Sequence, residues 1–312
     1  MAKRVKITTT VESIPLDKAL DEFITYCKMR NLRPATISYY ETIISGYLYK
    51  VLDSKFPTCD ITPSTVQDLI FFCRNELQIK DVSINSMLRG TRSIFYYFMK
   101  IGYTSKFNIQ LIKQDKSIIE TYNDEEITVL LAKPNKHCNF LEYRDWAVSN
   151  FLLATGCRLS TLVNIQTKDV NFDDNLITYT HTKNRKQQIV PLSPTLKYIL
   201  FEYLKIRGDG EYLFCNAYGE QLKPSLLSHS LCDYNRKRGI SKTGVHRWRH
   251  TFAKKWIMNG GDIFRLQKLL GHTDMSMVRN YVNIFSDDLV KDFDVFNPLE
   301  NMNHNRKRIK MK

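Results

Sequence analysis

The stretch from His246 to Tyr281 constrains the fold of this chain most, because its apolar residues recur at the spacing of three short helices. The first helix, which begins near Val245, has four apolar residues on one face: Trp248, Phe252, Trp256 and Ile257. Asn259-Gly260-Gly261 ends it, and Asp262 is placed to cap the second helix. The second helix has its own apolar face: Ile263, Leu266, Leu269 and Leu270. The stretch therefore predicts a packed helical unit.

Polar residues occupy particular positions in this unit. His246 and Arg249 are three residues apart, so they share one face of the first helix. Gly271 ends the second helix, which places His272 at a helix end, where a side chain can point into a cleft. Tyr281 follows nine residues later on the third helix.

Together these residues form a recognisable pattern. H-x-x-R at His246–Arg249, L-G-H at Leu270–His272, and a tyrosine nine residues after that histidine resemble the C-terminal signature of the tyrosine recombinase (phage integrase) family. H-x-x-R alone occurs by chance in many proteins. Three elements in order at these spacings are a specific signal.

Two earlier segments extend the resemblance. Thr155-Gly156-Cys157-Arg158 resembles the T-G-x-R segment that carries the family's first catalytic arginine. The family usually has Glu or Asp three residues later, whereas this chain has Thr161. Residues 176–181 and 187–192 have the pattern of two strands joined by a polar turn. In the family a lysine in this turn serves catalysis; Lys183 matches best, with Lys186 as the alternative.

The resemblance implies a catalytic set and a reaction without metal or cofactor. The six residues are Arg158, Lys183, His246, Arg249, His272 and Tyr281. By resemblance, Tyr281 attacks DNA to form a 3′-phosphotyrosyl link, and Lys183 protonates the departing 5′ oxygen. His246 assists proton transfer and His272 bonds the scissile phosphate. The two arginines suit the non-bridging phosphate oxygens, because a guanidinium fork matches phosphate geometry and stays charged.

The expected fold is mainly α with a small antiparallel β-sheet (α+β). At 312 residues the chain is long enough for two domains. Four or five amphipathic helices in residues 14–102 resemble the family's helical core-binding domain, which precedes the integrase-type catalytic domain. We expect five segments: an N-terminal arm at 1–13, the DNA-binding bundle at 14–102, a basic linker at 103–121, the catalytic domain with its C-terminal docking helix at 122–300, and a basic tail at 301–312.

Helices of the bundle carry cationic and hydroxyl side chains of the kind that contact DNA phosphates. Five of them are candidate DNA-contacting residues: Arg33, Thr36, Arg89, Thr91 and Arg92. The alternative is that they form an ordinary solvated polar face.

Net charge and cysteine content indicate the partner and the compartment. Forty-six Lys plus Arg against 32 Asp plus Glu give a net charge of +14, which suits a polyanionic partner or simply keeps the protein in solution. The seven cysteines are scattered without a C-x-x-C pair, which favours reduced thiols in a cytoplasm over disulfides or zinc. We see no signal peptide and no apolar run of the ~18 residues that a membrane span needs.

The expected function is site-specific DNA recombination through a Holliday junction, as the integrase or transposase of a mobile element. The expected partner is double-stranded DNA at specific sites, bound by a homotetramer that is a monomer in solution, with accessory DNA-bending proteins as possible helpers. Residues 287–296 have an apolar stripe that resembles the family's docking segment. The alternatives are a type IB topoisomerase-like enzyme and a catalytically silent DNA-binding regulator on the same fold.

Overall fold

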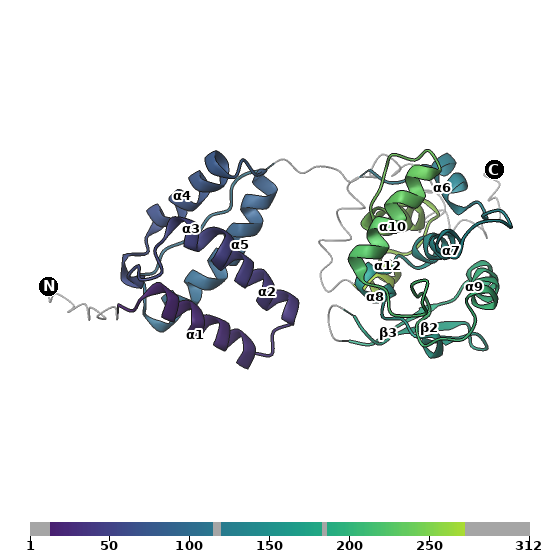
Figure 1. The fold of residues 1–312 in the computed structure, drawn as a ribbon, viewed down its shortest axis with the longest axis horizontal. Coiled ribbons are helices and arrows are strands. Elements are labelled where there is room, and N and C mark those ends of the chain that lie inside the picture. Colours follow the sequence, from purple (N-terminus) through teal and green to yellow (C-terminus); the bar gives the residue numbers. More distant parts are fainter. Residues whose placement is uncertain (1–12, 115–119, 183–185, 272–312) are drawn as a thin grey trace, which may run out of the picture. The chain divides into compact units, whose positions relative to one another are not determined.

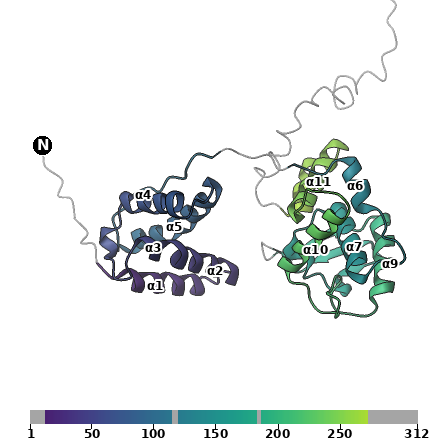
Figure 2. The same ribbon diagram turned by 45° about the horizontal axis from the view of Figure 1, so that its top comes forward.

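The computed structural model describes residues 13–114, 120–182 and 186–271. The chain divides into two compact units, residues 1–117 and 118–312 (Figure 1). Figure 2 shows the same elements from a second direction.

The described part of the first unit is a bundle of helices. Its elements are α1 (Leu16–Met29), α2 (Pro34–Ile43), the π-helical turn η1 (Ile44–Leu48), α3 (Tyr49–Val51), the 3₁₀ turn η2 (Thr58–Asp60), α4 (Pro63–Phe71), the π-helical turn η3 (Phe72–Glu76) and α5 (Asp81–Ile101). Proline stands at the first position of α2 and α4, where its missing N–H costs no hydrogen bond. The apolar face of α5, with Ile94, Phe95 and Phe98 fully buried, forms the centre of the core.

Residues 103–114, expected in the linker, pack on this bundle. Ile109 is buried, and Thr104 donates a hydrogen bond to the Ile61 carbonyl over 2.9 Å. The Asn85 side chain bonds both the N–H and the carbonyl of Ile112. These contacts hold residues 104–112 against α5 and the loop before α4, so the bundle extends beyond residue 102.

The second unit combines helices with a three-stranded antiparallel sheet. Its elements are α6 (Asp124–Leu131), α7 (Phe140–Thr155), α8 (Leu159–Leu162), the 3₁₀ turn η4 (Thr167–Asp169), β1 (Val170–Asn171), β2 (Leu176–Tyr179), β3 (Gln188–Pro191), α9 (Pro194–Arg207), α10 (Pro224–Lys237), α11 (Val245–Met258) and α12 (Ile263–Leu270). The strand order is β1-β2-β3, and Ile177 of β2 pairs with Val170 and with Val190. The predicted mainly α fold with a small antiparallel sheet is confirmed. The two-residue strand β1 was not predicted.

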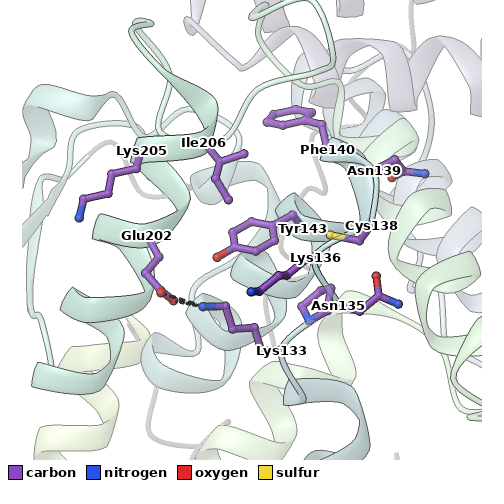
Figure 3. A pocket seen from close by; sticks show the side chains of 11 residues that line it. Lys133, Asn135, Lys136, Cys138, Asn139, Phe140, Tyr143, Glu202, Lys205 and Ile206 are labelled. Atoms are coloured by element: carbon purple, nitrogen blue, oxygen red, sulfur yellow. Dashed lines mark hydrogen bonds and ion pairs between the residues drawn. The ribbon is translucent and has the colours of Figure 1, made fainter.

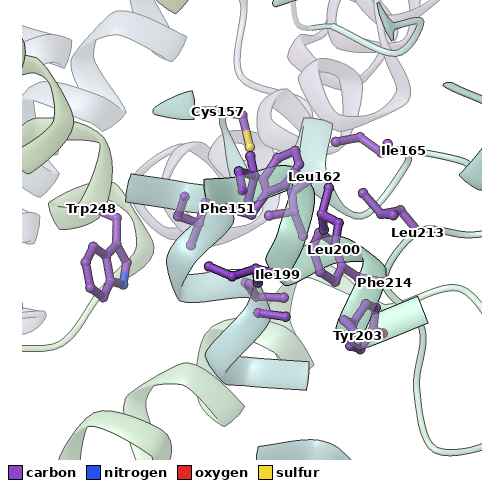
Figure 4. Packing of buried hydrophobic residues seen from close by; sticks show 14 of the residues in the cluster. Phe151, Cys157, Leu162, Ile165, Ile199, Leu200, Tyr203, Leu213, Phe214 and Trp248 are labelled. Atoms are coloured by element: carbon purple, nitrogen blue, oxygen red, sulfur yellow. The ribbon is translucent and has the colours of Figure 1, made fainter. Parts of the chain in front are cut away.

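The core of the second unit surrounds α7, which packs on α9, α10 and α11. Figure 4 shows Phe151 of α7 among apolar side chains from several elements. Its ring meets that of Phe214 edge to face, with centroids 5.4 Å apart. Trp248 of α11 is also buried and lies against Tyr122.

A smaller apolar cluster joins α11 to α12 and positions the site. Its buried members are Phe252, Ala253, Leu266 and Leu270. Because the cluster fixes the last turn of α12 against α11, it places Leu270, which precedes Gly271, against Gly156, the residue that ends α7. The predicted third helix with Tyr281 lies outside the described residues.

Candidate active site

Arg249 lies at the centre of the candidate site and is 6% exposed. Its Nη1 donates to the carbonyl of Gly156 over 2.7 Å, and its Nη2 donates to the carbonyl of Leu270 over 2.6 Å. The first carbonyl belongs to the T-G-x-R segment and the second to the L-G-H segment. One guanidinium therefore joins the two segments that carry Arg158 and His272.

Glycine permits the close approach of these segments. Gly156 has φ +60°, and a Cβ there would lie 2.4 Å from Phe252 Cδ1 and 2.9 Å from Leu270 Cδ2. Gly271 also has φ +60°. Both positions combine a backbone conformation that other residues rarely adopt with contact too close for a side chain.

Arg158 lies beside the same junction. It is the N-cap residue of α8, is half-buried, and has its Nη1 3.8 Å from the place a Gly271 Cβ would occupy. His246 is exposed in the first turn of α11, one turn before Arg249. The structure thus brings both predicted arginines to Gly271, the residue that precedes His272. Lys183, His272 and Tyr281 lie outside the described residues.

Thr161 does not take over the role of the family's acidic residue as a charged partner. It is 5% exposed in α8, and its N–H donates to the Arg158 carbonyl over 2.9 Å. A neutral hydroxyl at this buried position avoids the cost of burying a carboxylate, but it adds no negative charge near Arg158.

The β2–β3 hairpin borders the site. Thr182 Oγ1 donates to the Lys186 carbonyl over 2.6 Å, which links the residues after β2 to those before β3. Lys186, the alternative lysine, is exposed. Further along β3, Gln188 bonds the last turn of α12, so the hairpin and the L-G-H segment are connected.

Buried neutral groups form the wall behind the arginines. Burial raises the pKa of the Cys157 thiol to about 12, although Arg249 and Arg158 act in the opposite direction. Burial also raises the pKa of the Tyr179 hydroxyl well above its usual value. Both groups are therefore neutral at physiological pH. A neutral, dry wall strengthens the attraction between the arginines and a phosphate.

Two of the candidate DNA-contacting residues make side-chain contacts within the first unit. Thr91 is fully buried, and its hydroxyl bonds Met87 Sδ at 3.3 Å within α5, so the prediction that it contacts DNA is wrong. Arg92 is half-buried and donates from Nη2 to the Ile109 carbonyl, which holds the chain after α5 against the bundle. Arg89 is exposed, and Arg33 and Thr36 are half-buried at the start of α2. These three and Arg92 stay candidates.

Sequence reasoning missed the contribution of Gln188, since a single glutamine in a strand carries no signal of a partner 80 residues away. Arg247, which lies between His246 and Arg249, fastens the first residues of the second unit to α11. Its Nη1 donates to the Glu120 carbonyl, and its guanidinium lies 5.8 Å from the Tyr122 ring centroid.

A cavity of about 600 Å³ lies at the other end of α7 (Figure 3). Phe140 and Tyr143 of the first turn of α7 line it, together with the Lys133–Glu202 ion pair of 2.7 Å. A helix of 16 residues is about 24 Å long. The cavity is therefore separate from the Gly156 end, where the arginines lie.

Across residues 13–114, 120–182 and 186–271, no group of three or more His, Cys, Asp or Glu side chains is arranged to hold a metal ion. Within the same ranges, no helix has the length and apolar character to cross a membrane.

Residues 120–287, more than half of the chain, match the model of the phage integrase family. The tyrosine recombinase XerA of Pyrococcus furiosus is 28% identical over 290 residues, covering 91% of this chain and 96% of that protein. XerD of Staphylococcus haemolyticus is 26% identical over 299 residues, covering 91% and 99%.

Solved structures share the fold. A lambda integrase dimer bound to a COC′ core site has a TM-score of 0.69 at 18% identity, covering 96% of this chain and 81% of that one. The Tn1549 transposon integrase in complex with a circular intermediate DNA has a TM-score of 0.71 at 17% identity, covering 86% and 95%. The family match and these relatives define a recombinase of the tyrosine class. The chain belongs to the phage integrase family, whose members are DNA-cleaving and DNA-rejoining enzymes.

Proposed function

We propose that this protein is a site-specific DNA recombinase that cuts and rejoins strands through a 3′-phosphotyrosyl intermediate and a Holliday junction. The observation that carries the proposal is the convergence of Arg158 and Arg249 at Gly271, directly before His272 in the chain. Two guanidiniums at one point suit a phosphodiester, whose transition state gains negative charge on its non-bridging oxygens.

In the proposed reaction Tyr281 is the nucleophile. Its oxygen forms a bond to the scissile phosphorus while the bond from phosphorus to the 5′ oxygen breaks. The tyrosine proton leaves with assistance from His246, and Lys183 gives a proton to the departing oxygen. Rejoining reverses the step, since the 5′ hydroxyl of a partner strand attacks the phosphotyrosine and releases Tyr281.

The described residues support distinct parts of this scheme. Arg158 is half-buried beside Gly271, and in this scheme it contacts the phosphate directly. Arg249 is buried and bonded to two carbonyls, so it organises the site as well as supplying charge. The exposed position of His246 one turn before Arg249 is suitable for proton transfer at the surface of the site. No step in this scheme requires a metal ion.

The proposed partner is double-stranded DNA at specific sites in the cytoplasm, with a tetramer as the assembly that exchanges strands. A solved lambda integrase tetramer is bound to a Holliday junction, and this chain has its fold with a TM-score of 0.70. Arg33, Thr36, Arg89 and Arg92 are the proposed phosphate contacts of the first unit. Residues 287–296 are the proposed docking segment between protomers.

Two biological settings are proposed. Integration or transposition of a mobile element is supported by the fold shared with the lambda and Tn1549 integrases. Recombination between two sites of one chromosome is the second candidate, favoured by the nearly full-length match to XerA and XerD.

The proposal is tested with nicked duplexes that trap the covalent intermediate. The wild type should form a covalent protein–DNA complex in EDTA and join strands from two sites. Relaxation of supercoiled DNA without joined products would favour a topoisomerase-like enzyme. Binding without any covalent complex would favour a silent regulator.

A further inference from the structure

The side chain of Gln188 bonds the end of α12 from the neighbouring hairpin. Its Nε2 donates to the carbonyl of Lys268 over 3.0 Å and to the carbonyl of Leu269 over 2.7 Å. Arg249 donates a hydrogen bond to the carbonyl of the next residue, Leu270. Side chains from β3 and α11 thus bond the carbonyls of the last three residues of α12. Helix-terminal carbonyls lack partners within the helix, so such bonds fix its last turn.

Gln188 also lies beside Arg158. A Cβ added at Gly271 would lie 2.8 Å from Gln188 Oε1 and 3.8 Å from Arg158 Nη1. Both side chains therefore approach Gly271, one from β3 and one from the start of α8. The position of Gly271 relative to Arg158 depends on where Gln188 holds the last turn of α12.

We propose that Gln188 is a positioning residue for strand cleavage, which holds the last turn of α12 in the place where Arg158 meets the scissile phosphate. The inference rests on the proposed function, in which Arg158 contacts that phosphate. Gln188 itself does not contact DNA in this account. It acts through Gly271 and the backbone of α12.

The chemistry of the contact requires an amide. The amide nitrogen of Gln188 has two hydrogens and donates one to each of two carbonyls. Methionine has a side chain of similar length but no hydrogen-bond donor. Gln188→Met therefore removes both bonds while it keeps most of the side-chain volume. Gln187→Ala is the matched control, because Gln187 is adjacent, of the same type, and exposed.

The first measurement is single-turnover cleavage of a nicked duplex by the wild type, Gln188→Met and Gln187→Ala. Displacements of about 1 Å in a site can cost about 100-fold in rate. We expect cleavage by Gln188→Met to be slower by roughly 10- to 100-fold, with unchanged affinity for DNA. Gln187→Ala should match the wild type. Wild-type rates for Gln188→Met would overturn the inference.

A second measurement separates positioning of Arg158 from a general loss of structure. A methylphosphonate at the scissile position lacks the negative charge of the phosphodiester, so cleavage depends less on the guanidinium of Arg158. The cleavage rates of Arg158→Ala and Gln188→Met should therefore both be closer to the wild-type rate on the methylphosphonate than on the phosphodiester. Partial unfolding would lower the rates on both substrates equally, so the comparison remains valid for a less stable variant.

The outcomes distinguish this inference from the proposed function. A Gln188→Met defect of equal size on both substrates, beside a smaller Arg158→Ala defect on methylphosphonate, would overturn the inference alone. A wild type that forms no covalent complex on any plausible site would overturn both. Gly271→Ala gives an independent check. Its Cβ would displace Gln188, so it should reproduce the pattern of Gln188→Met.

Discussion

The guanidinium of Arg249 and the carbonyl of Gly156 are 2.7 Å apart, although 93 residues separate them in the chain. Gly156 precedes Arg158 by two residues, so this bond fixes one predicted catalytic arginine relative to the other. Arg249 therefore holds the backbone of the site in place and also supplies positive charge. Substitutions of Arg249 should affect stability and cleavage together.

Arg249→Lys keeps the positive charge but loses the planar fork that serves two carbonyls. A buried carbonyl left without a partner costs about 1–3 kcal/mol of unfolding free energy. Cleavage should fall by about 10²- to 10³-fold, as for loss of one preorganised donor. Urea unfolding and single-turnover cleavage measure the two effects. Arg265→Lys, at an exposed position on α12, is the control. Stability equal to the wild type would contradict the bonding role of Arg249.

Gly156→Ala should destabilise the protein more than Gly219→Ala. Both glycines have positive φ, so alanine at either position costs about 1–2 kcal/mol in backbone strain. At Gly219 nothing lies within 4 Å of an added Cβ, whereas at Gly156 Phe252 lies 2.4 Å away. Overpacking adds about 1–3 kcal/mol. The two unfolding free energies give the difference. Equal losses would mean that the contact with Phe252 relaxes without cost.

The buried ion pair between Arg144 and Asp145, at 2.7 Å, joins α7 to Ser230 of α10. Asp145→Asn leaves a buried guanidinium without its counter-charge, which costs about 3–5 kcal/mol. Asp233→Asn breaks the exposed pair with Arg236 and should cost less than about 1 kcal/mol. Denaturant unfolding of both variants tests the contrast. A loss below about 1 kcal/mol for Asp145→Asn would show that the pair does not hold α7.

His250 should make stability depend on pH. Burial, followed by the charges of His246 and Arg249, lowers the pKa of His250 below its ordinary value of 6.5. Below pH 6.5 the unfolded chain binds a proton that the folded protein resists. The contribution of His250 to stability is therefore present above pH 6.5 and is lost as pH falls through the lowered pKa. His250→Gln should reduce the loss of unfolding free energy between pH 7 and pH 5. The exposed His229→Gln is the control, and an unchanged pH profile in His250→Gln would contradict the prediction.

Local patterns predicted most helices and the hairpin because amphipathic spacing is a short-range property of the chain. The spacing of apolar residues in α5 also shows why the prediction that Thr91 contacts DNA was wrong. Leu88, Thr91 and Phe95 recur at i, i+3 and i+7, so Thr91 belongs to the buried face of α5 and not to a DNA-contacting one. The hydroxyl group of Thr91 suggested contact with a phosphate, but the position of a residue on its helix determines whether its side chain faces the core or the solvent.

The contacts between residues far apart in the chain could not be predicted from spacing in the sequence. The signature identified Arg158 and Arg249, but no spacing indicated that Arg249 bonds Gly156 and Leu270 or that Gln188 bonds α12. These contacts depend on how α11, α12 and the hairpin pack. The two-residue strand β1 is too short to form a pattern of its own.

The most direct test of the central claim compares the wild type with Tyr281→Phe on nicked duplexes that carry the recombination site, in EDTA, on denaturing gels. We expect a covalent protein–DNA band for the wild type and none for Tyr281→Phe, with DNA binding retained by both. A covalent band that persists in Tyr281→Phe would contradict the assignment of the nucleophile. Binding by the wild type without a covalent band would contradict the recombinase itself.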